Sequence, residues 1–140
     1  MTHKATIVEL PATTLIVYRA EQDREPEIKA AWQTLESKLT SLKGRKFYGL
    51  CYADASGTAY YAGVEPRDVE EVITIGLPTM AFTGGKYARV KLLDWPKHTD
   101  RISAIVEELE RTFRADPARP VVEHYRSHSE LHVLVPIAEE

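Results

Sequence analysis

Hydrophobic residues recur at helical spacing in two stretches of the chain that lie about 70 residues apart. The first stretch follows Pro26 and stops near Gly44, and the second follows Pro96. The apolar positions are Ile28, Trp32, Leu35, Leu39 and Leu42 in the first stretch, and Ile102, Ile105, Val106, Leu109 and Phe113 in the second. Steps of three and four residues place each set on one face of a helix. The pattern therefore predicts two amphipathic helices that each cover a hydrophobic layer.

Runs rich in β-branched and aromatic residues surround both predicted helices. After an extended start at residues 6–10, these runs cover residues 13–20, 46–53, 59–66, 70–78, 85–93, 120–126 and 130–136. Turn-forming residues separate most of them, as in the Asp-Ala-Ser-Gly segment between the second and third runs. We therefore expect strands on both sides of each helix.

The two halves of the chain match in pattern, with Leu35 opposite Ile105. We expect one domain over residues 1–140, with internal repeats at about 5–66 and 70–137. The predicted fold class is α+β, a pseudo-twofold repeat of strand-helix-strand-strand modules with a mostly antiparallel sheet and two helices. Such a sheet covers one face with its helices and leaves the other face partly open.

Composition and charge exclude several classes of protein. A net charge of −3 and a pI near 6.0 argue against direct nucleic-acid binding, which normally needs a basic surface. No apolar run approaches the ~20 residues that cross a bilayer, and the N-terminus has no signal-peptide pattern. The single cysteine, Cys51, fits a reducing compartment, so we expect a cytoplasmic protein. Metal-ligand spacings and nucleotide-binding motifs are absent from the sequence, so we expect no metal and no cofactor.

All seven tyrosines fall on predicted strands, although the chain has only three phenylalanines. They are Tyr18, Tyr48, Tyr52, Tyr60, Tyr61, Tyr87 and Tyr125. Trp32 lies on the first predicted helix, and Trp95 lies at the start of the second. Tyrosine is common in strands in any case, so ordinary packing within the sheet explains each one singly. Their number favours a lined cavity, because tyrosine offers an apolar ring face and a hydroxyl that can orient a ligand.

Glu123 interrupts the hydrophobic run of the strand at 120–126. Side chains alternate along a strand, so Glu123 shares one face with Val121 and Tyr125. Burial of an unpaired carboxylate is unfavourable, which leaves three interpretations. The residue lies on an exposed face, or it pairs with a basic residue such as Arg126, or it forms the floor of an aromatic pocket for a cationic or hydrogen-bonding ligand. Tyr125 on the same face favours the pocket.

Several segments together resemble the GyrI-like effector-binding domain, the small-molecule module of AraC-type and MerR-type drug-responsive regulators. The matching segments are VELPATTLIVYRA (8–20), EIKAAWQTL (27–35), YGLCYAD (48–54), YYAGVE (60–65), LPTMAFTGGKYARV (77–90), PVVEHY (120–125) and ELHVLVPI (130–137). Each segment alone is a weak signal, but their order and spacing are specific. The chain starts too close to the first strand for the helix-turn-helix region of those regulators, so a stand-alone form is expected.

The resemblance implies a ligand cleft between the two modules, with aromatic walls and a glutamate at its base. By position that glutamate is Glu123, with Tyr125 beside it. The resemblance suggests wall residues Tyr48, Tyr52, Tyr61, Tyr87 and Trp95, together with Trp32. Trp95 stands where many members have a small residue, usually glycine, and this difference would narrow the pocket or add a stacking wall.

Three functions are compatible with these features. The favoured one is non-catalytic binding of a small lipophilic or cationic organic molecule, as a drug or effector that is sensed or sequestered. A second is a hydrolase that acts on a strained electrophilic small molecule with Glu123 as general base. A third is a gyrase-inhibitor-like protein-interaction module that uses the acidic run Glu65, Asp68, Glu70 and Glu71. We expect a small organic ligand rather than a nucleic acid or a membrane as the partner, and the features favour binding over turnover while leaving both a hydrolase and a protein partner open.

Overall fold

The computed structural model describes residues 4–54 and 57–138. In the first half of the chain these residues form β1 (Thr6–Leu10), β2 (Thr13–Arg19), α1 (Glu25–Ser37), β3 (Phe47–Asp54), β4 (Gly57–Val64) and α2 (Val69–Ile75). In the second half they form β5 (Thr79–Phe82), β6 (Gly85–Leu93), the 3-10 turn η1 (Trp95–Lys97), α3 (Arg101–Thr112), β7 (Val121–Tyr125) and β8 (Glu130–Pro136). None of the helices in this part of the chain combines the length and the apolar character needed to span a membrane.

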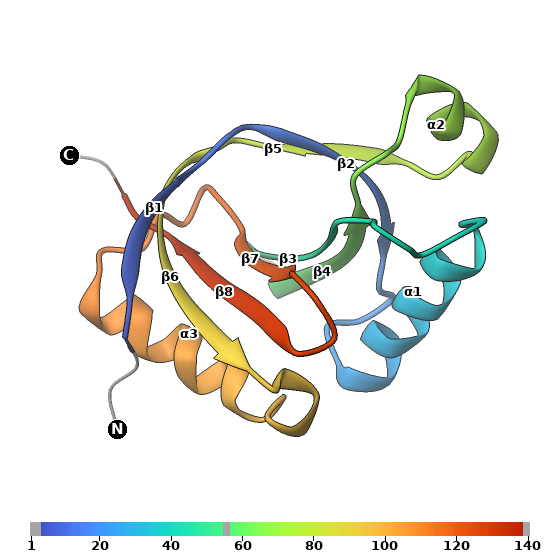
Figure 1. Cartoon of the computed structure of the whole chain (residues 1–140). Helices are drawn as coiled ribbons and strands as arrows, with labels where there is room; N and C mark the ends of the chain where they lie inside the picture. The colour runs from blue at the N-terminus through green and yellow to red at the C-terminus, as the bar shows by residue number, and fades with distance from the viewer. Residues whose placement is uncertain (1–3, 55–56, 139–140) are drawn as a thin grey trace.

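The eight strands form one antiparallel sheet in the order β1-β6-β8-β7-β3-β4-β2-β5. Exchanging β1 with β5, β2 with β6, β3 with β7 and β4 with β8 reproduces the same order read backwards. The sheet is therefore pseudo-twofold symmetric about its central pair, β3 and β7. It curls until β1, β2 and β5 lie across from β3 and β7 (Figure 1). The predicted α+β class and the repeated strand-helix-strand-strand modules are confirmed.

The two long segments at one side of the curled sheet approach each other closely. β1 runs on into β2 and β5 runs on into β6, and the two segments lie side by side in one antiparallel register, with Leu10 opposite Gly85 and Thr13 opposite Phe82. A Cβ atom at Gly84 would lie 2.2 Å from the carbonyl oxygen of Leu10 and 2.6 Å from the nitrogen of Ala12. Only glycine permits this approach, because both neighbouring atoms belong to the backbone.

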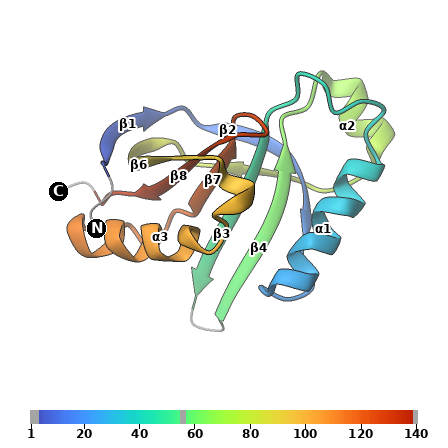
Figure 2. The same cartoon turned by 60° about the horizontal axis from the view of Figure 1, so that its bottom comes forward.

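Two helices cover the outer face of the curled sheet, which we call the helix face. α1 packs on β2 and β4, and α3 packs on β8 (Figure 2). The buried residues are Ala31 and Leu35 on α1, and Ile105 and Leu109 on α3. Leu35 therefore corresponds to Leu109, and the predicted match of Leu35 with Ile105 is wrong by one turn. The reason is that Pro96 lies in the separate turn η1, so α3 begins only at Arg101.

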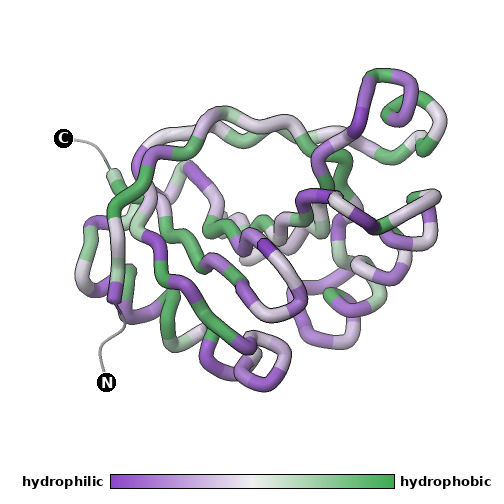
Figure 3. Tube along the Cα trace, viewed as in Figure 1, coloured by the Kyte–Doolittle hydropathy of each residue, from purple (hydrophilic) through white to green (hydrophobic). Residues whose placement is uncertain are grey.

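The opposite face of the sheet, which we call the inner face, has its own hydrophobic cluster. The cluster is built from Leu15, Val17, Tyr48, Leu50, Phe82, Tyr87, Val122 and Leu134. Hydrophobic positions accordingly run along the strands, while hydrophilic positions are frequent on the helices and loops (Figure 3). The sheet is thus apolar on both faces. The helices α1 and α3 cover one face, and the inner-face cluster lies on the other.

The segment predicted as a strand over residues 70–78 is wrong in its first part, because Val69–Ile75 form helix α2. The side chain of Asp68 caps the helix by accepting a hydrogen bond from the backbone nitrogen of Glu71 at 2.8 Å. Gly76 ends the helix in the left-handed conformation, with φ of 71°. The β-branched residues between these signals suggested a strand, but caps at both ends favour two helical turns.

Candidate functional site

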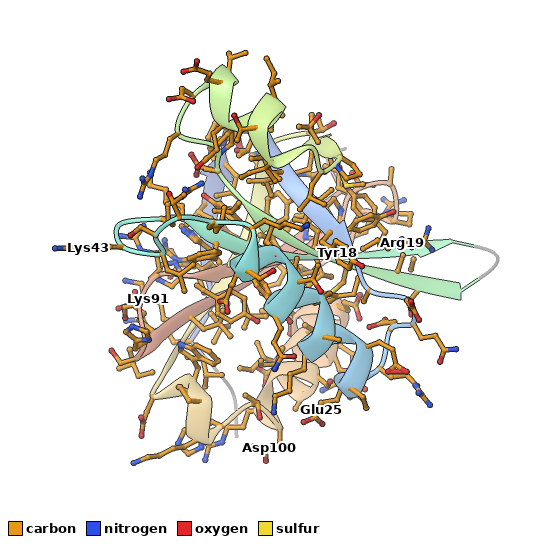
Figure 4. The ribbon with its side chains drawn as sticks, turned by 90° about the vertical axis from the view of Figure 1, so that its right-hand side faces the viewer. Tyr18, Arg19, Glu25, Lys43, Lys91 and Asp100 are labelled. Carbon is orange, nitrogen blue, oxygen red and sulfur yellow. The ribbon has the colours of Figure 1, made fainter. Side chains whose placement is uncertain are left out.

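A cavity of about 360 Å³ lies on the helix face, between α1 and α3. Its floor consists of central-strand residues Cys51, Tyr60, Val121 and Glu123. Its apolar walls come from Ile28 of α1 and from Ile102 and Val106 of α3. Figure 4 marks the starts of the two flanking helices with Glu25 and Asp100. The volume is within the range of small-molecule sites, which are about 300–1,000 Å³.

The charge lining this cavity is entirely negative. Asp23, Glu107 and Glu123 all line it, and no lysine or arginine is among its described lining residues. Glu123 is only 8% exposed. It forms no ion pair with any of the basic residues that the structure describes. Burial rules out the exposed-face interpretation, and the missing counter-ion rules out a structural salt bridge within these residues.

Two tyrosine hydroxyls hold the Glu123 carboxylate in place. Tyr60 and Tyr125 each donate a hydrogen bond to Oε1, both at 2.7 Å. The indole nitrogen of Trp32 donates to the hydroxyl oxygen of Tyr60 at 3.0 Å. This chain of hydrogen bonds links helix α1 to the floor of the cavity and orients the carboxylate.

The aromatic rings beside the carboxylate pack edge to face. The ring centroid of Tyr125 lies 5.4 Å from that of Trp32 and 5.0 Å from that of Trp95. Trp95 is also held by a hydrogen bond, because its indole nitrogen donates to the backbone oxygen of Ser127 at 3.0 Å. Trp32, Tyr60, Trp95 and Tyr125 therefore form one aromatic cluster, drawn from four different elements, next to Glu123.

Gly49 creates the space that the carboxylate occupies. It lies directly opposite Glu123 in the pairing of β3 with β7. A Cβ atom at Gly49 would lie 2.2 Å from the hydroxyl oxygen of Tyr60 and 2.4 Å from Oε1 of Glu123. The sequence alone did not identify Gly49 as a site residue, although a glycine inside a strand often marks such a close approach.

Burial raises the pKa of Glu123, and the charge of Asp23 raises it further, while the hydroxyls of Tyr125 and Tyr60 oppose both effects. Burial and the nearby carboxylate also raise the pKa values of Tyr60 and Tyr125 far above the ordinary value, so both phenols stay protonated and act as donors. A carboxyl group whose pKa is raised holds its proton more readily than usual. A bound cation would favour its ionised form.

This shift predicts how stability depends on pH. In the unfolded chain Glu123 ionises near its ordinary pKa of 4.5, but in the folded protein it does so at higher pH. Wild-type protein therefore loses stability as the pH rises from about 4.5 through the raised pKa, and Glu123→Gln does not. Urea titrations at a series of pH values give the free energy of unfolding of both proteins. We expect the value for Glu123→Gln, minus the value for wild type, to increase as the pH rises above about 4.5. A difference that shrinks with pH would show that the folded protein lowers the pKa.

The structure brings together four of the eight residues predicted for the site. Glu123, Tyr125, Trp32 and Trp95 meet on the helix face. The other four predicted residues, Tyr48, Tyr52, Tyr61 and Tyr87, lie on or beside the inner-face cluster. Tyr60, which was not among the predicted site residues, contacts Glu123 in place of its neighbour Tyr61. Ligand binding by any of these residues stays a prediction.

Solved structures with the same fold extend over almost the whole chain. The integron cassette protein VCH_CASS2 from the mobile metagenome of Vibrio cholerae matches with a TM-score of 0.65 and 16% identity, covering 96% of this chain and 95% of that one. SAV2435 bound to tetraphenylphosphonium matches with a TM-score of 0.71 and 16% identity, covering 96% and 94%. A hydrolase from Listeria innocua matches with a TM-score of 0.60 and 11% identity, covering 98% and 93%.

At these identities the structural matches establish the fold alone. No curated protein matches the sequence. Residues 6–137, in contrast, match the sequence model of one protein family, the integron-associated effector binding proteins known as Cass2. The resemblance to the GyrI-like domains is thereby confirmed, and the chain belongs to the GyrI-like family of integron-associated effector binding proteins.

Proposed function

We propose that the protein binds lipophilic organic cations in the cavity between α1 and α3, without catalysis, and that Glu123 forms the base of the site. The observation that carries this proposal is the buried carboxylate of Glu123, which has two neutral donors and no cationic partner among the described residues. A carboxylate in this situation is costly to the fold unless a ligand supplies the opposite charge.

The surroundings of Glu123 favour a cation with an apolar body. Asp23 and Glu107 add negative charge at the cavity, while Ile28, Ile102 and Val106 offer apolar surface. Tyr60 also lines the cavity, and an aromatic ring attracts cations through its π electrons. The structure of SAV2435 with tetraphenylphosphonium supports the proposal, because that protein has the same fold and binds a ligand of this class.

Titration with tetraphenylphosphonium tests the proposal, and Trp32 and Trp95 serve as fluorescent reporters because both contact Tyr125. We expect saturable quenching in wild type and binding about 10- to 100-fold weaker in Glu123→Gln, because one charge-assisted interaction is lost. Tetraphenylborate has nearly the same shape and the opposite charge, and it should not bind.

Glu110→Gln is the matched control, since this exposed carboxylate on α3 lies outside the residues lining the cavity. It should bind tetraphenylphosphonium as wild type does. Equal affinity of wild type and Glu123→Gln, with both proteins folded, would contradict a role for Glu123. Tight binding of tetraphenylborate would show that shape and apolar contact, rather than charge, select the ligand.

A hydrolase remains the second candidate because the same carboxylate has a raised pKa, which suits a general base. The fold match to the Listeria innocua hydrolase is compatible with it. Incubation with a strained electrophile, such as a spirocyclopropane, followed by chromatography, separates the two functions. Turnover that disappears in Glu123→Gln would favour the hydrolase.

The acidic run considered for protein binding is largely engaged within the chain. Glu71 forms an ion pair with Arg45 at 2.6 Å, and Glu65 accepts a hydrogen bond from the hydroxyl of Tyr48 at 2.6 Å. Asp68 caps helix α2. These internal contacts account for three of the four carboxylates and favour the small-molecule proposal.

A further inference from the structure

A second and larger cavity, of about 800 Å³, lies on the inner face of the curled sheet. Its lining includes residues 8–14, where β1 runs on into β2, together with inner-face side chains of β3, β6, β7 and β8. Glu123 and His124 are neighbours on β7, but Glu123 lines the first cavity and His124 lines the second. The two cavities are therefore separated by the thickness of the sheet.

Arg89 is the unusual residue of this inner cavity. It lies on β6, paired with Thr6 of β1 and Leu134 of β8, and it lines the cavity. Its Nε atom is buried without a hydrogen-bond partner. Within residues 4–54 and 57–138 its guanidinium also has no ion pair. Buried nitrogen donors are normally hydrogen-bonded, so an unsatisfied Nε atom needs an explanation.

Three further basic residues line the cavity without an ion pair among the described side chains. They are Lys46, Lys91 and Arg126. Figure 4 labels Lys91 on β6, two residues beyond Arg89 and hence on the same face of the sheet. Two of the carboxylates at the cavity are already engaged, since Glu65 accepts from Tyr48 and Glu130 contacts His132 at 2.6 Å. The third carboxylate at the cavity belongs to Glu9, which is exposed on β1.

The floor beside these basic residues is aromatic and neutral. The ring of His124 stacks on that of Tyr48, with centroids 4.4 Å apart and an interplanar angle of 19°. Burial, together with the charges of Arg126, His132 and Lys46, lowers the pKa of His124 to about 4. His124 is thus a neutral hydrogen-bonding group at neutral pH. The nearby charges of Arg126 and Lys46 give this part of the cavity a positive potential, which would favour an anion.

We propose that the inner cavity binds an organic monocarboxylate, with the carboxylate on the guanidinium of Arg89 and the apolar part on Leu10, Phe82 and Leu134. A guanidinium presents a planar fork that matches a carboxylate in two parallel hydrogen bonds. Four basic residues against three carboxylates leave a surplus of one positive charge, which matches a monoanion better than a dianion. The apolar lining residues accommodate an alkyl or aryl body.

Calorimetric titration with octanoate tests this second site. Wild type should bind octanoate saturably, and Arg89→Gln should bind it about tenfold more weakly or worse. Lys29→Gln is the matched control, because it removes one exposed positive charge from α1, on the other face of the sheet. It should retain wild-type affinity. Equal affinity of wild type and Arg89→Gln would overturn the proposal.

Other ligands and variants separate this site from the cation site. Glu123→Gln should bind octanoate normally, and Arg89→Gln should still bind tetraphenylphosphonium. Loss of octanoate binding in Glu123→Gln would place the anion in the cavity between the helices and overturn the proposal. Inorganic phosphate that binds as tightly as octanoate would overturn the choice of a carboxylate with an apolar body.

A measurement on wild type avoids dependence on the folding of the variant. A carboxylate bound beside His124 should raise the pKa of its imidazole from about 4, which the ring-proton chemical shifts report in an NMR pH titration. The shift should saturate with octanoate and should not occur with octylammonium. An unchanged pKa for His124 at saturating octanoate would contradict binding in the inner cavity.

Discussion

Replacing Gly49 by alanine is expected to abolish tetraphenylphosphonium binding while the protein still folds. The added methyl group would overlap the hydroxyl of Tyr60 and Oε1 of Glu123, which lie 2.2 and 2.4 Å from its position. These two groups, rather than the backbone, must move, and the ligand cavity that both of them line offers space beside them. We expect an affinity loss of more than about 100-fold. The destabilisation should be about 1–2 kcal/mol, typical of overpacking.

A double variant separates this steric effect from a general loss of structure. Glu123→Ala removes the carboxylate that the new methyl group would strike, so Gly49→Ala should be less destabilising in that background than in wild type. Unfolding midpoints in urea for the four proteins of the cycle measure the coupling. Additive effects, or full tetraphenylphosphonium binding by Gly49→Ala, would show that Gly49 does not make room for the site.

Replacing Gly84 by alanine is expected to cause the largest loss of stability, about 3 kcal/mol, at the upper end of overpacking costs. The methyl group would lie 2.2 Å from the oxygen of Leu10 and 2.6 Å from the carbonyl carbon of Pro11. Backbone atoms cannot rotate away as side chains can, so the paired segments β1–β2 and β5–β6 would have to separate at this point. Equilibrium denaturation followed by circular dichroism measures the effect.

The neighbouring residue offers the control for this prediction. Thr83 is exposed beside Gly84, and Thr83→Ala should change the unfolding free energy by less than about 0.5 kcal/mol. If Gly84→Ala were as stable as Thr83→Ala, the pairing of the two segments would not require close backbone contact at Gly84. The inner cavity, which residues 8–14 help to line, should be distorted in Gly84→Ala.

The order of helices and strands could be predicted from the sequence because hydrophobic spacing reports local geometry directly. The same local reasoning failed at residues 69–75, where β-branched residues form a short helix that Asp68 and Gly76 delimit. Helix α1 was predicted to continue toward Gly44, but it ends at Ser37 as hydrogen bonds tighten to three-residue spacing at Lys38 and Leu39. Such endings depend on backbone contacts that hydrophobic spacing does not record.

The candidate site was harder to predict, because it depends on which face of the sheet each side chain occupies. Alternation along β7 placed Glu123 and Tyr125 together without any structure. Deciding between Tyr60 and Tyr61 required the pairing of β4 with β3 and of β3 with β7, which join residues far apart in sequence. A shift of one residue in either pairing would have exchanged the two tyrosines.

The strand order also implies that neither half of the chain is complete. β1 pairs with β6, and β5 pairs with β2, so each half gives its first strand to the other half. A fragment that ends after β4 would keep β3, β4 and β2 paired but would leave both edges of that small sheet open. The chain is connected like two strand-exchanged subunits fused head to tail. Separately expressed halves should therefore be insoluble alone and should complement each other when co-expressed.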